Sequence, residues 1–312
     1  MKALTCAAAL AAMANPLSAA PVPVAANASE PSHAEHQRVR TFLKGSKGPV
    51  VVLIPGMSTP GAVWDDMTKT LAGDHRVLVV EVKGFDGQRA PTNERDGLID
   101  GIVADLAADL SARGLKTPVI AGHSFGGLVA MKFALAHPKT AKSLVIVDAL
   151  PFFGTVFAED ATVESIQPRA KAMRDMMIAQ ADKIRAVAAT GVAKDPGGNM
   201  SIDPALRIQI ASWAMKSDPL VVAQALWEDV RMDLRKDIAS IDVPMTVFYQ
   251  AHDAPALAAK RYTTDYAAQP KARLIPVRDT GHFIQLDQPE TVRTAIVEAA
   301  RYAISRPGSR SR

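Results

Sequence analysis

The segment Gly122-His123-Ser124-Phe125-Gly126-Gly127 has the residue types needed to present a serine hydroxyl for nucleophilic attack. It follows an apolar run at residues 118–121, which is typical of a buried strand, and it precedes an apolar stretch at 128–136 that is typical of a helix. A serine between a strand and a helix lies on a sharp turn, and the glycines two positions away on each side leave room for that turn. The N-terminus of the following helix favours a developing negative charge. We therefore predict that Ser124 is a nucleophile.

A serine hydroxyl needs a base to accept its proton, and the chain has seven histidines. His282 lies in the segment Asp279-Thr280-Gly281-His282-Phe283, just after the last strand-like run. The loop after that strand returns to the edge of the sheet where Ser124 is expected. The sequence therefore predicts His282 as the base.

The imidazole in turn needs a carboxylate to fix its tautomer and stabilise its charged form. Asp253 lies just beyond a late strand-like run, and it gives the chain order Ser124, Asp253, His282. We predict Asp253 as this acid. Asp148 is the alternative, because it ends the strand after the nucleophile helix. Asp279 and Asp287 are predicted to be structural, with Asp287 capping the last helix.

Two backbone N–H groups are expected to bind the oxyanion of an acyl-transfer intermediate. One belongs to Phe125, the residue after the nucleophile. The other is expected in the loop after residue 54, where Gly56 permits close approach and Met57 is the predicted donor. Pro55 has no N–H and cannot serve.

The elements that must position these residues are short apolar runs that alternate with helical patterns. Such near-continuous apolar strands indicate a sheet that is buried on both faces and is therefore mostly parallel. The alternation predicts a doubly wound α/β fold. Apolar residues at helical spacing from 99 to 110 predict a helix that ends near Gly114, and Pro289 is predicted in the first turn of the last helix. The strand-like runs lie at residues 50–54, 76–82, 118–121, 144–147, 244–249 and 272–277.

Residues 151–236 interrupt the alternation of strands and helices, because they contain no convincing strand. They are predicted to form an inserted cap of several helices, separated at Pro168, at 195–198 and at 218–219, with the α/β core at 38–150 and 237–303. The cap is rich in methionine and aromatic residues, which suit a pocket for an apolar acyl chain or aryl group. The residues predicted to line this pocket are Phe152, Phe153, Met176 and Trp213.

The first 20 residues are typical of a secretory signal peptide. Lys2 is followed by an apolar run that is too short to span a bilayer, and small residues follow Pro16. Cleavage near Ala20 would remove Cys6, the single cysteine. We expect a secreted or periplasmic protein with no stable membrane insertion after cleavage, a flexible leader at 21–37 and a basic tail at 304–312.

The amino-acid composition excludes several classes of protein. The chain of 312 residues is 48% hydrophobic and 22% charged, which excludes a disordered, collagen-like or coiled-coil protein. Lys2 and the three tail arginines account for the formal charge of +4, so the body is neutral and a nucleic-acid partner is not expected. The sequence shows no metal-binding cluster and no Gly-rich phosphate cradle.

Residues 38–303 resemble the α/β-hydrolase superfamily. The segments that carry this resemblance are Gly122 to Gly127, Gly281-His282-Phe283 and Gln288-Pro289-Glu290. The segments 82–88 and 147–152 are similar to a secreted bacterial subgroup of esterase-like serine hydrolases. The resemblance implies a helical cap, a cofactor-free site and, most often, ester hydrolysis. The sequence departs from the usual pattern in two places: Pro55-Gly56 replaces the usual His-Gly of the oxyanion loop, and Lys83-Gly84-Phe85-Asp86-Gly87 replaces the usual Asp-x-x-Gly-x-Gly turn.

The sequence thus favours a secreted serine hydrolase that cleaves small-molecule carboxylic esters through an acyl-enzyme. An amidase or aminopeptidase of the same fold is an alternative, and it would need a cap carboxylate for the substrate amine. Glu159, Asp160 and Glu164 are available for that role. A non-catalytic ligand-binding module with a vestigial triad is the alternative from a different class.

Overall fold

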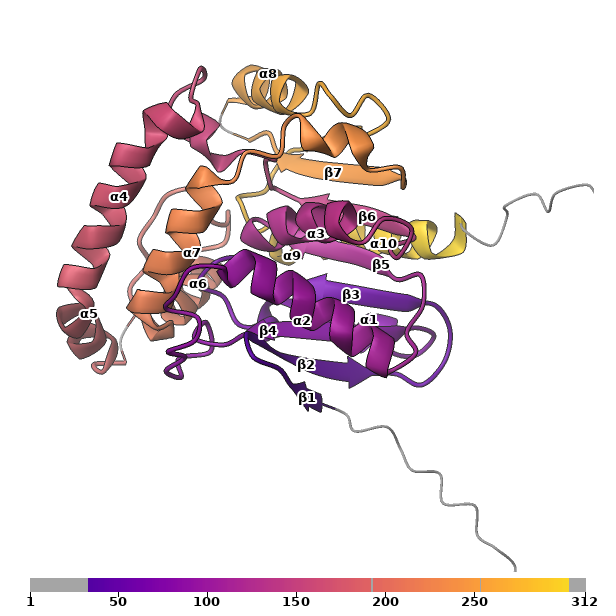
Figure 1. Cartoon of the computed structure of the whole chain (residues 1–312), viewed down its shortest axis with the longest axis horizontal. Coiled ribbons are helices and arrows are strands. Elements are labelled where there is room, and N and C mark those ends of the chain that lie inside the picture. The colour runs from indigo at the N-terminus through magenta and orange to yellow at the C-terminus, as the bar shows by residue number, and fades with distance from the viewer. Residues whose placement is uncertain (1–32, 192, 253, 303–312) are drawn as a thin grey trace, which may run out of the picture. The chain divides into compact units, whose positions relative to one another are not determined.

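The computed structural model describes residues 33–191, 193–252 and 254–302. Eight strands form one sheet in the order β1-β2-β4-β3-β5-β6-β7-β8 (Figure 1). The strands are β1 (His33–Glu35), β2 (Val39–Lys44), β3 (Val50–Ile54), β4 (Arg76–Val82), β5 (Val119–His123), β6 (Ser143–Val147), β7 (Met245–Gln250) and β8 (Arg273–Val277).

The six strands from β3 to β8 are parallel, as their near-continuous apolar sequences predict. The mostly parallel α/β fold is thereby confirmed. At one edge, β2 runs antiparallel to β4, and β1 pairs antiparallel with β2. Neither of these two strands is predicted by the sequence. Residues 33–35 belong to the predicted flexible leader, so that prediction is wrong for them, and the rest of the leader up to residue 32 lies outside the described residues.

Helices cover both faces of the sheet (Figure 1). Val50, Val52 and Ile54 of β3 face a core shared with the helices α2 and α3, whereas Val51 and Leu53 face a core shared with α1, α9 and α10. This alternation is the period of two expected for a buried strand. The helices of the two layers are α1 (Asp65–Leu71), α2 (Leu98–Ala112), α3 (Phe125–Ala136), α9 (Ile284–Asp287) and α10 (Pro289–Tyr302).

Local signals place the ends of two helices correctly. Gly114 has a φ of +62°, and the N–H of Leu115 donates to the carbonyl of Leu110 at 2.9 Å, which closes α2 with a glycine in the left-handed region. Pro289 is the first residue of α10, where its missing N–H costs nothing.

Between β6 and β7 the described chain forms helices and connecting loops, with no strand. The helices lie beside the carboxyl ends of the parallel strands (Figure 1). Residues 218–219 separate α6 from α7 as predicted, and Asp218 caps α7. Pro168 instead lies inside α4 and separates no helices. These elements are η2 (Phe153–Val156), α4 (Val163–Ala179), α5 (Ala181–Ala188), α6 (Pro204–Lys216), α7 (Pro219–Arg231) and η3 (Asp237–Ser240), and α8 (Pro255–Asp265) follows β7.

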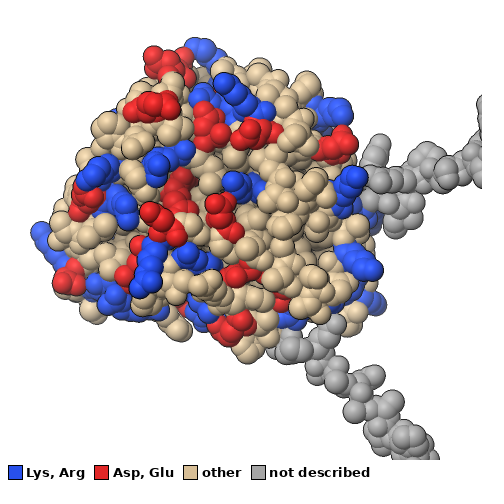
Figure 2. Space-filling view, in the orientation of Figure 1, with Lys and Arg blue, Asp and Glu red and all other residues tan. Residues whose placement is uncertain are grey.

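Acidic and basic side chains are interspersed on the face shown in Figure 2. This mixture agrees with the neutral body expected from the sequence. Within the described ranges, no helix has both the length and the apolar character needed to cross a membrane. The same residues contain no cluster of three or more His, Cys, Asp or Glu side chains suited to a metal ion.

Candidate active site

Ser124 lies at a strained turn between β5 and α3. Its φ of +52° and ψ of −122° are unfavourable for a residue with a side chain. The turn forces close backbone contacts: a Cβ at Gly122 would lie 2.1 Å from the carbonyl oxygen of Gly126, and a Cβ at Gly126 would lie 2.5 Å from the carbonyl oxygen of Ile54. Only glycine fits at either position. The turn also brings the N–H of Ser124 to the carbonyl of Val147 on β6, at 2.9 Å.

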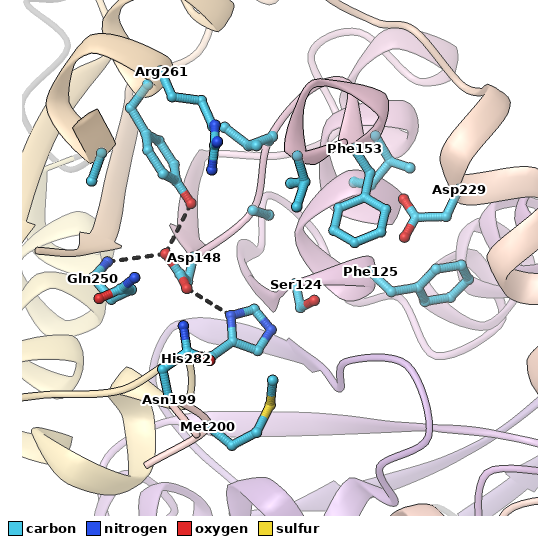
Figure 3. Close-up of a pocket in the computed structure, with 16 residues that line it drawn as sticks. Ser124, Phe125, Asp148, Phe153, Asn199, Met200, Asp229, Gln250, Arg261 and His282 are labelled. Atoms are coloured by element: carbon cyan, nitrogen blue, oxygen red, sulfur yellow. Dashed lines mark hydrogen bonds and ion pairs between the residues drawn. The ribbon is translucent and has the colours of Figure 1, made fainter. Parts of the chain in front are cut away.

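His282 is held by a carboxylate, but that carboxylate is not the predicted one. Its Nδ1 donates a hydrogen bond to Oδ2 of Asp148 at 2.6 Å (Figure 3). Asp148 is the alternative that the sequence also offers. The predicted acid, Asp253, lies outside the described residues. The structure therefore pairs His282 with Asp148, and the assignment of this role to Asp253 stays a prediction.

The position of Asp148 explains this pairing. It directly follows β6, the strand between β5 and β7 in the sheet, and its N–H donates to the carbonyl of Phe248 on β7 at 2.8 Å. Its φ of +48° marks a sharp turn at the strand end. The carboxyl ends of β6 and β7 lie side by side, so an acid after either strand can reach a histidine after β8. The spacing of residues along the chain cannot distinguish them.

Two further donors fix the Asp148 carboxylate. Its Oδ1 accepts hydrogen bonds from the N–H of Gln250 at 3.0 Å and from the hydroxyl of Tyr262 at 2.9 Å. The Tyr262 ring is buried and stacks on Tyr249 with ring centroids 4.5 Å apart. Burial, followed by the nearby Asp148 charge, raises the pKa of Tyr262 well above its ordinary value, so its phenol stays protonated and can donate. Sequence reasoning missed both donors, since neither belongs to a recognisable motif.

The loop that carries His282 is fastened to the cap. The N–H of His282 donates to the carbonyl of Asn199 at 2.7 Å, and the N–H of Gly281 donates to Oδ2 of Asp287 at 2.7 Å. The other Asp287 oxygen accepts from the Ser201 hydroxyl at 2.5 Å. Asp287 is the last residue of α9, and its side chain joins two loops. The prediction that it caps the last helix is therefore wrong.

His123, the second residue of the motif, connects the same parts. Its buried ring lies 4.6 Å from the His282 ring, and its Nε2 donates to the His282 carbonyl at 3.1 Å. Burial, and secondly the neighbouring His282, hold the pKa of His123 well below its ordinary value, so it is neutral. A Cβ at Gly56 would lie 2.7 Å from its Nδ1. His123 therefore packs between the loop that contains Gly56 and the loop that contains His282.

The two residues predicted to supply the oxyanion donors belong to segments that meet at Ser124. Phe125 is the first residue of α3, so its N–H is one of those that lack an acceptor within the helix. On the other side, a Cβ at Gly56 would lie 3.4 Å from the Ser124 Cβ, which places the loop containing Met57 against the serine. Thr59 closes that loop, because its hydroxyl donates to the Gly56 carbonyl at 2.8 Å.

A cavity of about 330 Å³ opens beside Ser124 and His282 (Figure 3). Phe153 lines it, as predicted. The other three predicted pocket residues do not: Phe152 is fully buried in a cap core, Trp213 packs against the α1–α10 core, and Met176 is 55% exposed. Most of the cavity wall is apolar. The lining residues are Ser124, Phe125, Leu128, Asp148, Ala149, Leu150, Phe153, Val156, Asn199, Met200, Asp229, Gln250, Ala258, Arg261, Tyr262 and His282.

Asp229 on α7 is a buried carboxyl group in this cavity that sequence reasoning missed. Its burial raises the pKa from 3.8 to about 7. No signal in the sequence distinguishes it from the acidic residues on the solvent side of the cap.

Asp229 should make the protein less stable as the pH rises. Below about pH 4 the group is protonated in both states. Between about pH 4 and pH 7 the unfolded chain releases the proton that the folded chain keeps, so the free energy of unfolding falls. The difference between 3.8 and about 7 corresponds to about 4 kcal/mol at pH 8. We therefore expect Asp229→Asn to raise the thermal midpoint at pH 8 and to change it little at pH 4, as measured by calorimetry.

The matched control for this stability measurement is Asp182→Asn, which removes a fully exposed carboxylate from α5. It should show no such difference between the two pH values. The expectation is contradicted if, at pH 8, the thermal midpoint of the Asp229→Asn variant is lower than that of the unmodified protein.

Residues 51–295 match the model of the alpha/beta hydrolase family. The chain belongs to this family. The match includes the Ser124 turn, Asp148 and His282, and it agrees with the resemblance seen in the sequence.

The proteins to which the chain is similar include esterases. The chain is 28% identical to pimeloyl-[acyl-carrier protein] methyl ester esterase of Vibrio atlanticus over 208 residues, which cover 65% of the chain and 76% of that enzyme. A stretch of 110 residues, 35% of the chain, is 37% identical to polyketide synthase ThaQ of Burkholderia thailandensis, of which it covers only 5%. A thermophilic esterase from Thermogutta terrifontis has the same fold, with a TM-score of 0.68 at 21% identity over 88% of this chain and 99% of the esterase.

Proposed function

We propose that the protein is a serine hydrolase that cleaves carboxylic esters through an acyl-enzyme. One observation carries the proposal: a serine on a strained strand–helix turn shares a cavity with a histidine whose Nδ1 donates to Asp148 at 2.6 Å. This is the arrangement that nucleophilic catalysis by serine requires.

In this mechanism the Ser124 oxygen attacks the ester carbonyl carbon while Nε2 of His282 accepts the hydroxyl proton. Asp148 holds the tautomer with hydrogen on Nδ1 and stabilises the imidazolium that forms. The N–H groups of Phe125 and Met57 stabilise the oxyanion. His282 then gives its proton to the leaving alcohol, and water hydrolyses the acyl-enzyme by the same steps.

We favour an ester over an amine-bearing peptide substrate, because the three carboxylates that the sequence offers for an aminopeptidase do not line the cavity. Asp229 is the one cap carboxyl group among the lining residues, and aminoacyl amides are therefore included in the test below. Glu159 instead pairs with Lys260 at 2.6 Å, and both side chains are more than half exposed. Glu164 and Asp160 are also on the exposed surface. Esterases among the relatives support the same choice.

The cavity wall indicates the chemical character of the substrate. Leucine, phenylalanine, valine and methionine side chains are among those that line it, and most of the wall is apolar. We infer that the substrate is a small molecule with an apolar acyl or aryl portion, and the volume of about 330 Å³ suits a group of modest size.

Covalent labelling tests the proposed function directly. A fluorophosphonate probe should label the wild-type protein at Ser124, and a series of p-nitrophenyl esters of increasing acyl length should be hydrolysed. Absence of labelling together with absence of hydrolysis would favour the ligand-binding alternative. Hydrolysis of aminoacyl amides faster than of the matched esters would favour the amidase.

We also propose that the protein is exported. Residues 1–20, whose sequence supports this proposal, lie outside the described residues. N-terminal sequencing of the native protein should find a start near Ala20 or Pro21, and a start at Met1 or Lys2 would refute export.

A further inference from the structure

Asp229 is buried in the wall of the cavity that contains Ser124. Its side chain comes from α7 and is only 6% exposed. Figure 3 shows its carboxyl group pointing into the cavity beside the Phe153 ring and near Phe125. Two aromatic side chains therefore lie next to this buried carboxyl group.

The other buried aspartates of the described chain have partners that explain them. Asp109 accepts from the Thr41 hydroxyl at 2.7 Å and pairs with Arg113 at 2.8 Å. Asp265 accepts from Thr155 at 2.6 Å, and Asp218 caps α7 and pairs with Arg185 at 2.9 Å. For Asp229, the structure shows no hydrogen bond or ion pair to its carboxyl group among the described residues.

A carboxyl group without a partner is costly to bury, and the cost is larger for the ionised form. The packing of the Asp229 side chain does not offset that free-energy cost, because an apolar residue of similar size would fill the same space. A ligand that enters the cavity can supply the missing hydrogen bond. Unpaired polar groups in such a cavity are a common source of substrate specificity.

The relative positions of three residues show which part of an ester would meet Asp229. In Figure 3, His282 and Asp229 lie on opposite sides of Ser124. In the proposed mechanism His282 must give a proton to the leaving alcohol, so the alcohol portion lies on its side. The acyl portion then extends toward Asp229.

We propose that Asp229 is a specificity residue that binds a hydrogen-bond donor, a hydroxyl or an ammonium group, on the acyl portion of the substrate. This rests on the proposed ester hydrolysis. The acyl group would thus carry its polar group at Asp229 and be apolar elsewhere, since Leu128 and Phe153 are among the side chains that line the cavity.

Three matched series of p-nitrophenyl esters, with acyl chains of the same lengths that end in methyl, hydroxyl or ammonium, test this proposal. For the wild type we expect kcat/KM for a hydroxyl-ended or ammonium-ended ester to exceed that of the methyl-ended ester by roughly tenfold or more at one chain length, since a hydrogen bond to a carboxylate has about that effect. The hydroxyl and ammonium series show which donor is preferred.

Two variants keep the test independent of folding. Asp229→Leu should reverse the preference toward the methyl-ended ester, and Asp229→Asn should lose any preference for ammonium while it keeps part of the preference for hydroxyl. Asp182→Asn, on the exposed side of the cap, should behave as wild type. Thermal midpoints confirm that all three variants are folded.

The proposed subsite is refuted if the wild type prefers the methyl-ended ester at every length, or if Asp229→Leu keeps the wild-type preference. Neither result affects the proposed ester hydrolysis, which the methyl-ended series and the fluorophosphonate label test separately. Loss of hydrolysis for all three series in the wild type would instead refute the proposed function.

Discussion

Replacing Ser124 with alanine should lower kcat for ester hydrolysis by roughly 10⁴-fold or more and leave the fold intact. The hydroxyl is the only group at this turn that can form the acyl-enzyme. Alanine also fits the turn, because it adds no atom to the backbone contacts that Gly122 and Gly126 permit. Initial rates with a p-nitrophenyl ester at equal folded concentration measure the loss.

Labelling provides the control for this variant. Ser124→Ala should not react with a fluorophosphonate, whereas its circular dichroism and thermal midpoint should resemble those of the wild type. If Ser124→Ala hydrolyses the ester at a near-normal rate, the nucleophile is another residue and the serine mechanism is wrong.

The parts of this site that could be predicted from the sequence are those built from neighbouring residues. Gly122 and Gly126 stand two positions from Ser124 because the turn has no space for their side chains, so the chemistry leaves a local pattern. Apolar runs likewise identify the central strands, since both faces of these strands are buried. The edge strand β2 lacks that continuous pattern, and the sequence does not reveal it.

The parts that could not be predicted depend on contacts between distant segments. Asp148 and His282 are 134 residues apart, and their bond depends on which of two adjacent strands ends with the acid. Asp287 and Ser201, 86 residues apart, join the His282 loop to the cap. Neither pair is constrained by spacing along the chain.

The cap illustrates a different limit. Composition correctly indicates an apolar cavity, but it cannot say which helix faces point inward. Met176 and Trp213 have the right chemistry, yet one is exposed and the other packs against the sheet. Asp229 has the wrong chemistry for a buried wall and nevertheless lines the cavity.

Replacing Asp148 with asparagine should lower kcat by several orders of magnitude, whereas Asp253→Asn should stay close to wild type. The same exchange at the triad aspartate costs about 10⁴-fold in a serine protease of unrelated fold. Initial rates of the two variants are compared at equal folded concentration, with circular dichroism as the check on folding. If Asp253→Asn is inactive and Asp148→Asn is active, the acid is Asp253, although the Ser124–His282 pair could still stand.

The contacts of Asp148 explain why the asparagine variant should be so impaired. The N–H of Gln250 and the hydroxyl of Tyr262 both donate to Oδ1, so the amide oxygen of an asparagine would be held at that position. Its NH₂ group would then face Nδ1 of His282. Because two donors cannot share that contact, Nδ1 would have to become the acceptor and the hydrogen would move to Nε2. An imidazole with hydrogen on Nε2 cannot accept the proton of Ser124, so the variant would keep its fold and lose its base.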